Sequence, residues 1–351
     1  MTSDGVKSSQ FKRAFAVLGV AVAAVVSTAC GSGSSDKDTT PAAPAADAGR
    51  PFDLQAHRGG RGMTIEESLP GFAKAIELGV STLELDIVLS KDRVPLIWHD
   101  PVIQAEKCTD TAPAAPGDPQ YPYVGKVIHD LTYDQIHTLD CGKKLAGFPD
   151  AQELPGNKIA KLPELFDLVK TYPGAFEALR YNVETKVEAE HPEQSATPDE
   201  FVDVILDAVT AAGATRRVEI QSFDWRSLPL VKARNSSIPT VALYDATTFV
   251  PNSPWLGPIR YENHAGDALG AIKALGADIS SPDHQLSDVT AEYVAKAHRL
   301  GLEVVPWTVN DKDSIGKTLD MGVDGLITDY PNRAREVMRD KGYPLPESFR
   351  K

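Results

Sequence analysis

The sequence predicts an α/β fold, a TIM (β/α)8 barrel with an insertion after an early strand. Short β-rich runs alternate with amphipathic helical runs from residue 51 onward, and this alternation is typical of a parallel sheet. The number of units and a length of about 290 residues fit a closed barrel. No GxGxxG follows the first strand, which weakens a dinucleotide-binding interpretation and leaves an open doubly wound sheet as the structural alternative.

The first 29 residues are predicted to be a processing signal and not part of the fold. Lys7, Lys12 and Arg13 form a charged region, and residues 14–29 form an apolar run too short and too rich in alanine to favour a membrane span. The run ends in small residues directly before Cys30. This segment resembles a bacterial lipoprotein signal, which implies that Cys30 is the lipidated first residue of the mature chain. An ordinary secretory signal cleaved nearby is the alternative.

Residues 30–50 are rich in Gly, Ser, Pro, Ala and Asp and have no apolar periodicity. Such a segment cannot bury a core, so we expect a flexible tether. Together with the lipidated cysteine, the tether would hold a domain at residues 51–345 outside the cytoplasm, anchored to the cell membrane.

The elements expected in the barrel domain follow from residue 51 in order. The strands are expected at 53–57, 82–88, 94–98, 180–185, 217–221, 238–243, 277–280, 302–306 and 323–327. The helices are expected at 69–79, 161–171, 199–213, 225–234, 265–275, 289–300, 311–320 and 331–340. In the first helix, Ser68 can cap the start, Pro70 suits the first turn, and Gly79 can end the helix in the left-handed conformation.

Residues 101–160 interrupt this alternation and contain Cys108 and Cys141. The segment is rich in Pro, Gly, Tyr and Asp, so we interpret it as an insertion that overhangs the carboxyl ends of the strands. Outside the cytoplasm a disulfide between the two cysteines is favoured. Two free buried thiols are the alternative.

The net charge of −13 over 351 residues limits the partners of this chain. A nucleic-acid-binding protein normally presents a basic face, so the acidic balance argues against that class. An anionic substrate would have to be attracted by local cations or a bound metal, and not by the field of the whole protein.

Three acidic residues at expected strand ends could hold a metal ion. Glu84 and Asp86 are two residues apart on one strand and therefore point to the same face. Two carboxylates pointing together into a barrel would repel each other, and a divalent cation would remove that cost, with Glu184 as a third ligand. Oxygen ligands alone favour Ca²⁺ or Mg²⁺ over zinc. A salt-bridge network with Arg58 or Lys186 is the alternative.

Two histidines follow expected strands beside charged residues. His57 and His99 could act as base and acid on opposite sides of one site. Arg58 and Lys186 could hold a phosphate and neutralise charge that develops on its oxygens. The remaining histidines are expected to be solvent-exposed in loops or helices: His129, His137, His191, His264, His284 and His298. Since parallel strands end at one rim, these parts predict phosphoryl transfer chemistry.

Six segments in order resemble the glycerophosphodiester phosphodiesterase family over about residues 53–340. They read AHRGG…EES, LELDIVLSKDRVPLIWHD, NVETK, IQSFDW, VVPWTVND and GVDGLITDYP. The resemblance implies a TIM barrel that hydrolyses glycerophosphodiesters to glycerol 3-phosphate and an alcohol. Related barrel enzymes that act on intact phospholipids, such as sphingomyelinase D, and a non-catalytic ligand-binding surface lipoprotein are the competing interpretations.

The resemblance also assigns roles to particular residues. It implies His57 and His99 as the acid/base pair, with Glu84, Asp86 and Glu184 binding the divalent cation. It implies five substrate-binding residues, namely Arg58, Glu66, Lys186, Gln221 and Trp307. The chain departs from the family pattern Pro-Glu-Asn-Thr at Ile65-Glu66-Glu67-Ser68. The added charge leaves open which glutamate faces the site. The alcohol that leaves, the choice between Ca²⁺ and Mg²⁺, and the oligomeric state are also open.

Overall fold

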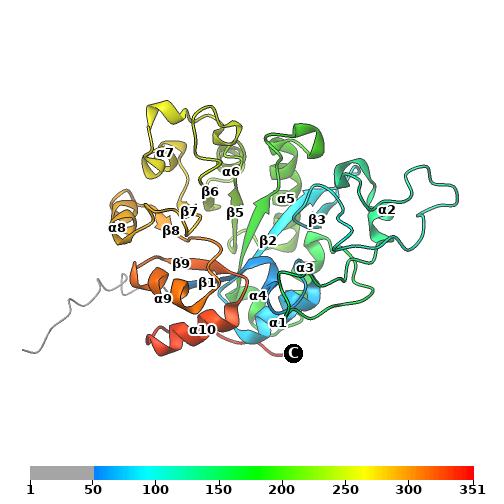
Figure 1. The fold of residues 1–351 in the computed structure, drawn as a ribbon, viewed down its shortest axis with the longest axis horizontal. Helices are drawn as coiled ribbons and strands as arrows, with labels where there is room; N and C mark the ends of the chain where they lie inside the picture. Colours follow the sequence, from blue (N-terminus) through cyan, green and yellow to red (C-terminus); the bar gives the residue numbers. More distant parts are fainter. Residues whose placement is uncertain (1–50) are drawn as a thin grey trace, which may run out of the picture. The chain divides into compact units, whose positions relative to one another are not determined.

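Eight parallel strands form a nearly closed barrel in the computed structural model, which describes residues 51–351 (Figure 1). Their order around the barrel is β8-β7-β6-β5-β4-β2-β1-β9, and hydrogen bonds from Asp324 N to Val304 O and from Ile327 N to Pro306 O, each 3.0 Å, link the two ends. The strands are β1 (Asp53–Ala56), β2 (Thr82–Leu89), β4 (Arg180–Thr185), β5 (Val218–Ser222), β6 (Thr240–Tyr244), β7 (Ile279–Pro282), β8 (Glu303–Val304) and β9 (Gly325–Thr328). The predicted TIM barrel is confirmed, whereas the signal peptide, Cys30 and the tether lie outside the described residues.

All eight predicted helices are present, with bounds within a few residues of those expected. They are α1 (Leu69–Leu78), α3 (Leu162–Lys170), α5 (Pro198–Ala212), α6 (Ser227–Arg234), α7 (Ala268–Leu275), α8 (Ala291–Arg299), α9 (Lys312–Asp320) and α10 (Pro331–Asp340). The shorter helices are α2 (Tyr133–His137), α4 (Ala175–Ala178), and the 3-10 turns His57–Gly59, Ile128–Asp130, Pro192–Gln194, Pro254–Leu256 and Tyr261–Asn263. Between residues 51 and 351, none of the helices has the length and apolar character needed to cross a membrane.

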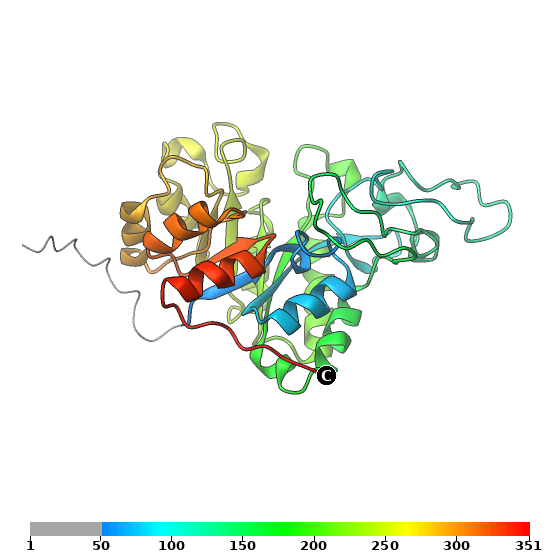
Figure 2. The ribbon, with the colours of Figure 1, turned by 60° about the horizontal axis from the view of Figure 1, so that its bottom comes forward.

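Helix α1 shows how the sequence sets its own ends. The Ser68 hydroxyl accepts a hydrogen bond from Gly71 N at 3.1 Å, which satisfies one of the free amides of the first turn. Gly79 follows the helix with φ 96° and ψ 96°, so its φ is positive but its conformation is not the predicted left-handed helical one. The chain leaves this end beside the C-terminal segment, where Phe349 N donates to Ile76 O (Figure 2).

The predicted strand at 94–98 exists but lies outside the barrel. Strand β3 (Pro95–Ile97) pairs antiparallel with β2, with Ile97 opposite Ile87. The connection from Ser90 to Val94 is a tight turn, in which Arg93 N donates a hydrogen bond to Ser90 O. The backbone of Arg93 has a φ of 61°. A connection this short can join antiparallel strands, whereas a parallel pair needs a crossover of about a dozen residues or more.

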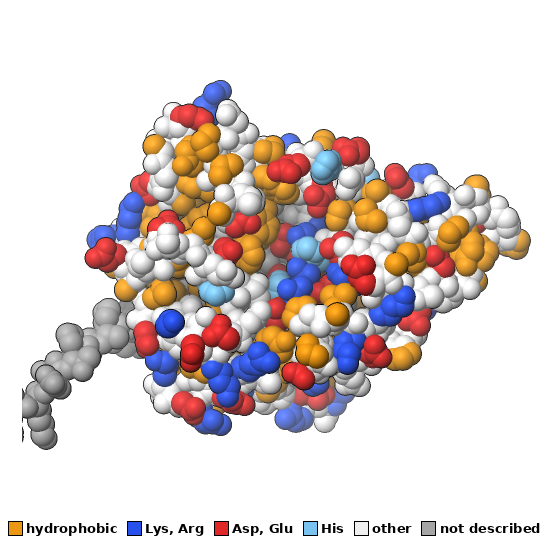
Figure 3. Space-filling view, viewed as in Figure 1, with side chains coloured by type: hydrophobic (Ala, Val, Ile, Leu, Met, Phe, Trp, Pro, Cys, Tyr) orange, Lys and Arg blue, Asp and Glu red, His pale blue; other side chains and the backbone are white. Residues whose placement is uncertain are grey.

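The carboxyl ends of the barrel strands carry most of the buried polar residues discussed below. Figure 3 shows a hollow near the centre of the face, in which histidine, basic and acidic side chains gather. The insertion after β3 extends from the barrel beside this hollow (Figure 1). The fold therefore provides a recessed rim with a large loop segment next to it.

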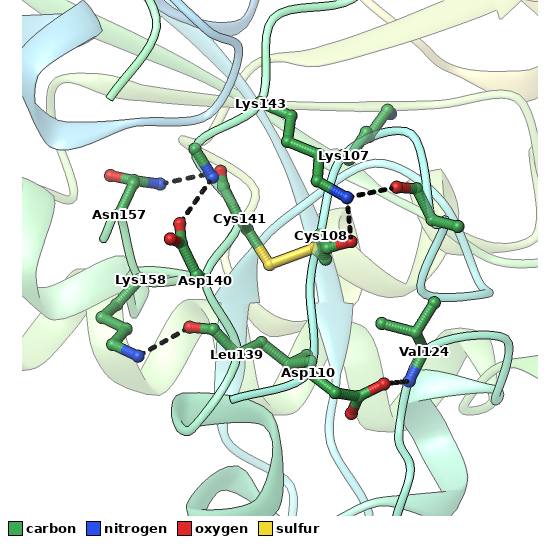
Figure 4. Close-up of a disulfide and its surroundings, with 12 residues drawn as sticks. Lys107, Cys108, Asp110, Val124, Leu139, Asp140, Cys141, Lys143, Asn157 and Lys158 are labelled. Atoms are coloured by element: carbon green, nitrogen blue, oxygen red, sulfur yellow. Dashed lines mark hydrogen bonds between the residues drawn. A yellow bond between two sulfur atoms is a disulfide. The ribbon is translucent and has the colours of Figure 1, made fainter. Parts of the chain in front are cut away.

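The insertion at residues 101–160 has a small core of its own. Tyr123, Ile128, Leu131 and Leu139 are almost completely buried there, packed with the two cysteines. A disulfide joins Cys108 to Cys141, as predicted (Figure 4). The ammonium group of Lys143 also ties the segment together, because it donates to the carbonyls of Ala105 and Cys108.

Removing this disulfide is expected to destabilise the protein. The bridge closes a loop with a sequence separation of 33 residues, which in the loop-entropy model stabilises the fold by about 3–4 kcal/mol. We expect the free energy of unfolding of the double variant Cys108→Ser, Cys141→Ser, measured with urea, to fall by about that amount. Wild-type protein treated with reductant should show the same loss. An unchanged midpoint in the double variant would show that the insertion core holds without the bridge.

Candidate active site

A cluster of three buried carboxylates lies on the neighbouring strands β2 and β4. The β2 pleat turns Glu84 and Asp86 to the interior, while Leu83 and Leu85 pack in the main hydrophobic core. Glu184 lies on β4 directly opposite Asp86 in the parallel register. One oxygen from each of the three lies within 4.8 Å of the others. The structure therefore brings together all three predicted metal ligands.

Nearby cations offset only part of the negative charge. A fourth carboxylate, Glu67, lies beside the cluster, because its Oε1 accepts a hydrogen bond from Asp86 N at 3.1 Å. The Arg58 Nε lies 3.0 Å from Asp86 Oδ2, and the Lys186 Nζ lies 2.8 Å from Glu184 Oε1. Both ion pairs of the alternative interpretation thus form. Four buried carboxylates still face two cations.

The oxygen atoms of this cluster fit a hard divalent cation. Within residues 51–351, Oδ1 of Asp86 accepts no hydrogen bond, and neither does Oε2 of Glu67. Burial raises the pKa of Glu84 well above its usual range, and it raises that of Glu184 to about 8, with the Asp86 charge adding to both effects. The cluster therefore needs a proton or a cation, and carboxylate oxygens are the ligands that Mg²⁺ and Ca²⁺ prefer.

His57 follows β1 and is held by a buried carboxylate. Its Nδ1 lies 2.6 Å from Oδ1 of Asp329, which follows β9. Asp329 is fixed in turn by Arg61 Nε at 2.7 Å and by Asn310 Nδ2 at 2.7 Å. Burial lowers the pKa of His57, although the Asp329 charge opposes this. The Nδ1 of this imidazole is thus turned to a carboxylate, which fixes the orientation of the ring.

His99 follows β3 and has a similar arrangement. Its Nδ1 lies 2.9 Å from Oδ1 of Asp100, and its side chain is 29% exposed. Burial, and then the charges of Lys186 and Arg58, lower the pKa of His99 to about 3. The Arg58 charge also lowers the pKa of His57. One guanidinium thus lies close enough to influence both imidazoles.

A strained turn after β1 positions Arg58. Arg58, Gly59 and Gly60 have φ of 52°, 76° and 81°, so three successive residues adopt the left-handed region. At Gly59 a side chain would also meet Phe72 atoms at 3.1 Å. The turn directs Arg58 N toward Glu84 Oε2 at 2.8 Å. The His-Arg-Gly-Gly sequence thereby places an arginine against the acidic cluster.

The two neighbouring glutamates have different surroundings. Glu66 accepts hydrogen bonds from Arg58 Nη1 at 3.3 Å, from Arg61 Nη1 at 3.2 Å and from Lys107 Nζ at 2.5 Å. Burial alone would raise its pKa, but the Arg58 and Lys107 charges lower it to about 2. Glu67 instead faces the acidic cluster. Both glutamates are buried, with Glu67 toward the candidate metal ligands and Glu66 toward the insertion.

Gln221 lies on β5, and Trp307 follows β8. The buried Gln221 amide donates to Glu84 Oε1 at 2.5 Å, so it contacts the acidic cluster directly. The half-buried Trp307 ring stacks edge-on against Phe223 at 5.2 Å, and Phe223 lies 6.4 Å from Trp255. Since the Lys186 ammonium is 5.9 Å from the Phe223 ring, these aromatic rings form a wall next to the cations.

Three other histidines are less exposed than predicted. His129, His264 and His284 are half-buried, whereas the other three are exposed. The insertion packs back on β2, where His129 Nδ1 lies 3.1 Å from Leu89 O. The segment after β7 bonds to the next strand end, because His284 N donates to Trp307 O at 2.8 Å. These histidines lie in loops that fold over the rim, and neither helical nor strand periodicity predicts the burial of a loop residue.

Comparison with known proteins agrees with this geometry. Residues 57–333 match the model of the glycerophosphoryl diester phosphodiesterase family. A glycerophosphodiester phosphodiesterase of Caldanaerobacter subterraneus subsp. tengcongensis is 25% identical over 287 residues, which cover 82% of this chain and 98% of that protein.

Two solved structures are similar in fold. A Silicibacter pomeroyi protein proposed to be a glycerophosphoryl diester phosphodiesterase has a TM-score of 0.71 at 30% identity, covering 84% of this chain and 95% of its own. An Oleispira antarctica phosphodiesterase in complex with sn-glycerol-3-phosphate has a TM-score of 0.59 at 18% identity, covering 82% and 96%. The chain therefore belongs to the glycerophosphoryl diester phosphodiesterase family and is an enzyme of that class.

Proposed function

We propose that this enzyme hydrolyses glycerophosphodiesters to glycerol 3-phosphate and an alcohol, with a divalent cation and with His57 and His99 as the acid/base pair. One observation carries the proposal. Two imidazoles, each paired with a carboxylate, lie within the influence of Arg58, which itself contacts the buried Glu84 and Asp86. The product bound to the Oleispira phosphodiesterase, sn-glycerol 3-phosphate, supports this assignment.

The proposed mechanism uses a nucleophile that the substrate already carries. When bound by Glu84, Asp86 and Glu184, a divalent cation would stabilise negative charge on the substrate oxygens. Arg58 and Lys186 bind the phosphate and offset charge that develops in the transition state.

Proton transfer then falls to the two imidazoles. One histidine takes the proton of a glycerol hydroxyl, whose oxygen attacks phosphorus and forms a cyclic phosphate. The other histidine gives a proton to the departing alcohol oxygen. Water then opens the ring with the roles reversed, so that both imidazoles return to their starting protonation states.

Asp329 should be needed to orient His57. Replacing it by asparagine keeps the side-chain shape but removes the charge that holds Nδ1. We expect Asp329→Asn to lower kcat on the order of 10–100-fold, as is usual when an orienting partner is lost. Steady-state kinetics with glycerophosphocholine would measure this. A variant with wild-type kcat would mean that His57 needs no such partner.

A substrate panel tests the proposed function against its main competitor. We expect release of glycerol 3-phosphate from glycerophosphocholine and glycerophosphoethanolamine, and no hydrolysis of phosphatidylcholine or sphingomyelin vesicles. ³¹P NMR of the products would distinguish the glycerol phosphate from a lipid phosphate. Hydrolysis of the intact lipids alone would favour the phospholipase D-like alternative, and no turnover of any diester would favour a ligand-binding lipoprotein.

We further propose that Cys30 carries the lipid and that the tether holds the barrel outside the cytoplasm, at the cell membrane. The lipoprotein-like signal supports this proposal. Wild-type protein expressed in bacteria should partition into the detergent phase of Triton X-114, whereas Cys30→Ser should stay in the aqueous phase. Detergent partitioning that does not change in the variant would exclude this anchor.

A further inference from the structure

We propose that Lys107, which belongs to the insertion, is a positioning residue for the hydrolysis proposed above. Its ammonium group joins Asp100, the partner of His99, to Glu66, the partner of Arg58 and Arg61. The inference depends on the proposed function. It gives the insertion a specific task, which is to hold His99 in its working orientation.

The contacts form an unbroken path between the two imidazoles. Lys107 stands at the one point where this path enters the insertion. In order, the path runs through His57, Asp329, Arg61, Glu66, Lys107, Asp100 and His99. Each link is an ion pair or hydrogen bond between oppositely charged or polar side chains. A change at Lys107 would therefore release Asp100 from this path and remove one of the three cations that hold Glu66.

The burial of Lys107 indicates that its ammonium group depends on these ion pairs. The residue is 7% exposed, and a buried ammonium group is costly unless it is paired. Both of its carboxylate partners come from the barrel rim: Asp100 follows β3, and Glu66 lies in the loop before α1. The remaining side of the ammonium group faces the Trp98 ring, 5.3 Å from the ring centre. Lys107 thus bridges two separate segments of the rim.

The insertion fixes the backbone on which Lys107 stands. The next residue is Cys108, which the disulfide ties to Cys141 (Figure 4). Lys107 O accepts a hydrogen bond from Lys143 N at 3.4 Å, and Lys143 Nζ holds the carbonyl of Ala105 at 2.7 Å. The disulfide and the lysine clamp therefore surround the one insertion side chain that reaches both rim carboxylates.

The expected consequence of losing Lys107 is catalytic more than structural. Without the ammonium group, Asp100 can turn toward solvent and no longer fixes Nδ1 of His99, so proton transfer from this ring becomes inefficient. Among the described residues, the ion pairs of Lys107 are made with Glu66 and Asp100, and not with a candidate metal ligand. We therefore expect kcat to fall on the order of 10–100-fold, the range typical of lost orienting partners, with KM changed by less than about threefold.

The test compares Lys107→Met, Lys107→Arg and Lys144→Met in steady-state kinetics with glycerophosphocholine. Lys144 is an exposed lysine of the same insertion whose ammonium group donates to Pro149 O, so it controls for loss of a charge. We expect Lys107→Met to lose kcat, Lys107→Arg to recover most of it, and Lys144→Met to match wild type. The double variant Asp100→Asn, Lys107→Met should be no slower than Asp100→Asn.

Two results would overturn the inference while leaving the proposed function intact. One is a Lys107→Met enzyme with wild-type kcat, and the other is an additive loss in the double variant. Failure of wild-type protein to hydrolyse any diester would instead reject the proposed function. Nitrogen NMR of the His99 ring needs no turnover: one tautomer in wild type and a mixture in Lys107→Met would support positioning, and identical spectra would contradict it.

Discussion

Replacing His99 by asparagine is expected to lower kcat for glycerophosphodiesters by about 10²–10⁴-fold, the usual contribution of general acid–base catalysis. The substitution removes the imidazole that follows β3 and keeps a side chain able to bond Asp100. The same loss is expected for His57→Asn, since one ring serves as acid where the other serves as base. Glycerol 3-phosphate release under saturating substrate would measure both variants.

The histidine variants need a matched control and a check of folding. His137 lies exposed on α2 in the insertion, beside Tyr133, so His137→Asn should keep wild-type kcat. Circular dichroism and the urea midpoint should be unchanged in His99→Asn, because the side chain is partly exposed at the rim. Wild-type turnover in either active-site variant would remove that histidine from the mechanism.

Replacing Glu84 by glutamine is expected to abolish turnover and to remove the stabilisation that a divalent cation gives. Wild-type protein at a cation concentration of about 100 times Kd should gain about 2.7 kcal/mol from binding to the folded state alone. Glu84→Gln loses a charged ligand and keeps the side-chain length, but its NH₂ group would face one of the two donors from which Glu84 accepts, Arg58 N or Gln221 Nε2. Differential scanning calorimetry with and without Mg²⁺ or Ca²⁺ would measure the difference.

An acidic residue elsewhere on the surface provides the control for this variant. Glu177 is exposed on α4 and is not one of the clustered carboxylates, so Glu177→Gln should keep both the cation-dependent rise in Tm and the activity. A Glu84→Gln protein that still gains stability from the cation would place the ion elsewhere.

The sequence predicts the barrel and the acidic cluster because both follow from local rules. The alternation of side chains along β2 places Glu84 and Asp86 on one face. Because parallel strands end at one rim, Glu184 on β4 lies beside them. The Cys108–Cys141 pairing was predictable for a different reason, since these are the cysteines left after Cys30.

Contacts between distant loops could not be predicted in this way. The Asp329 partner of His57 stands 272 positions away, and its role depends on β9 lying next to β1. Lys107 lies in an insertion without helical or strand periodicity, so nothing in its neighbourhood marks a lysine that reaches Glu66. The separate roles of Glu66 and Glu67 depend on side-chain directions in one loop, which composition and spacing do not determine.

The central claim is that three carboxylates on two strands hold a divalent cation that the two histidines need for hydrolysis. The most direct test measures glycerol 3-phosphate release by wild-type protein after EDTA treatment, and again while Mg²⁺ or Ca²⁺ is added back. We predict that turnover is lost in EDTA and returns with one of the two ions. Full turnover in metal-free protein would contradict the claim.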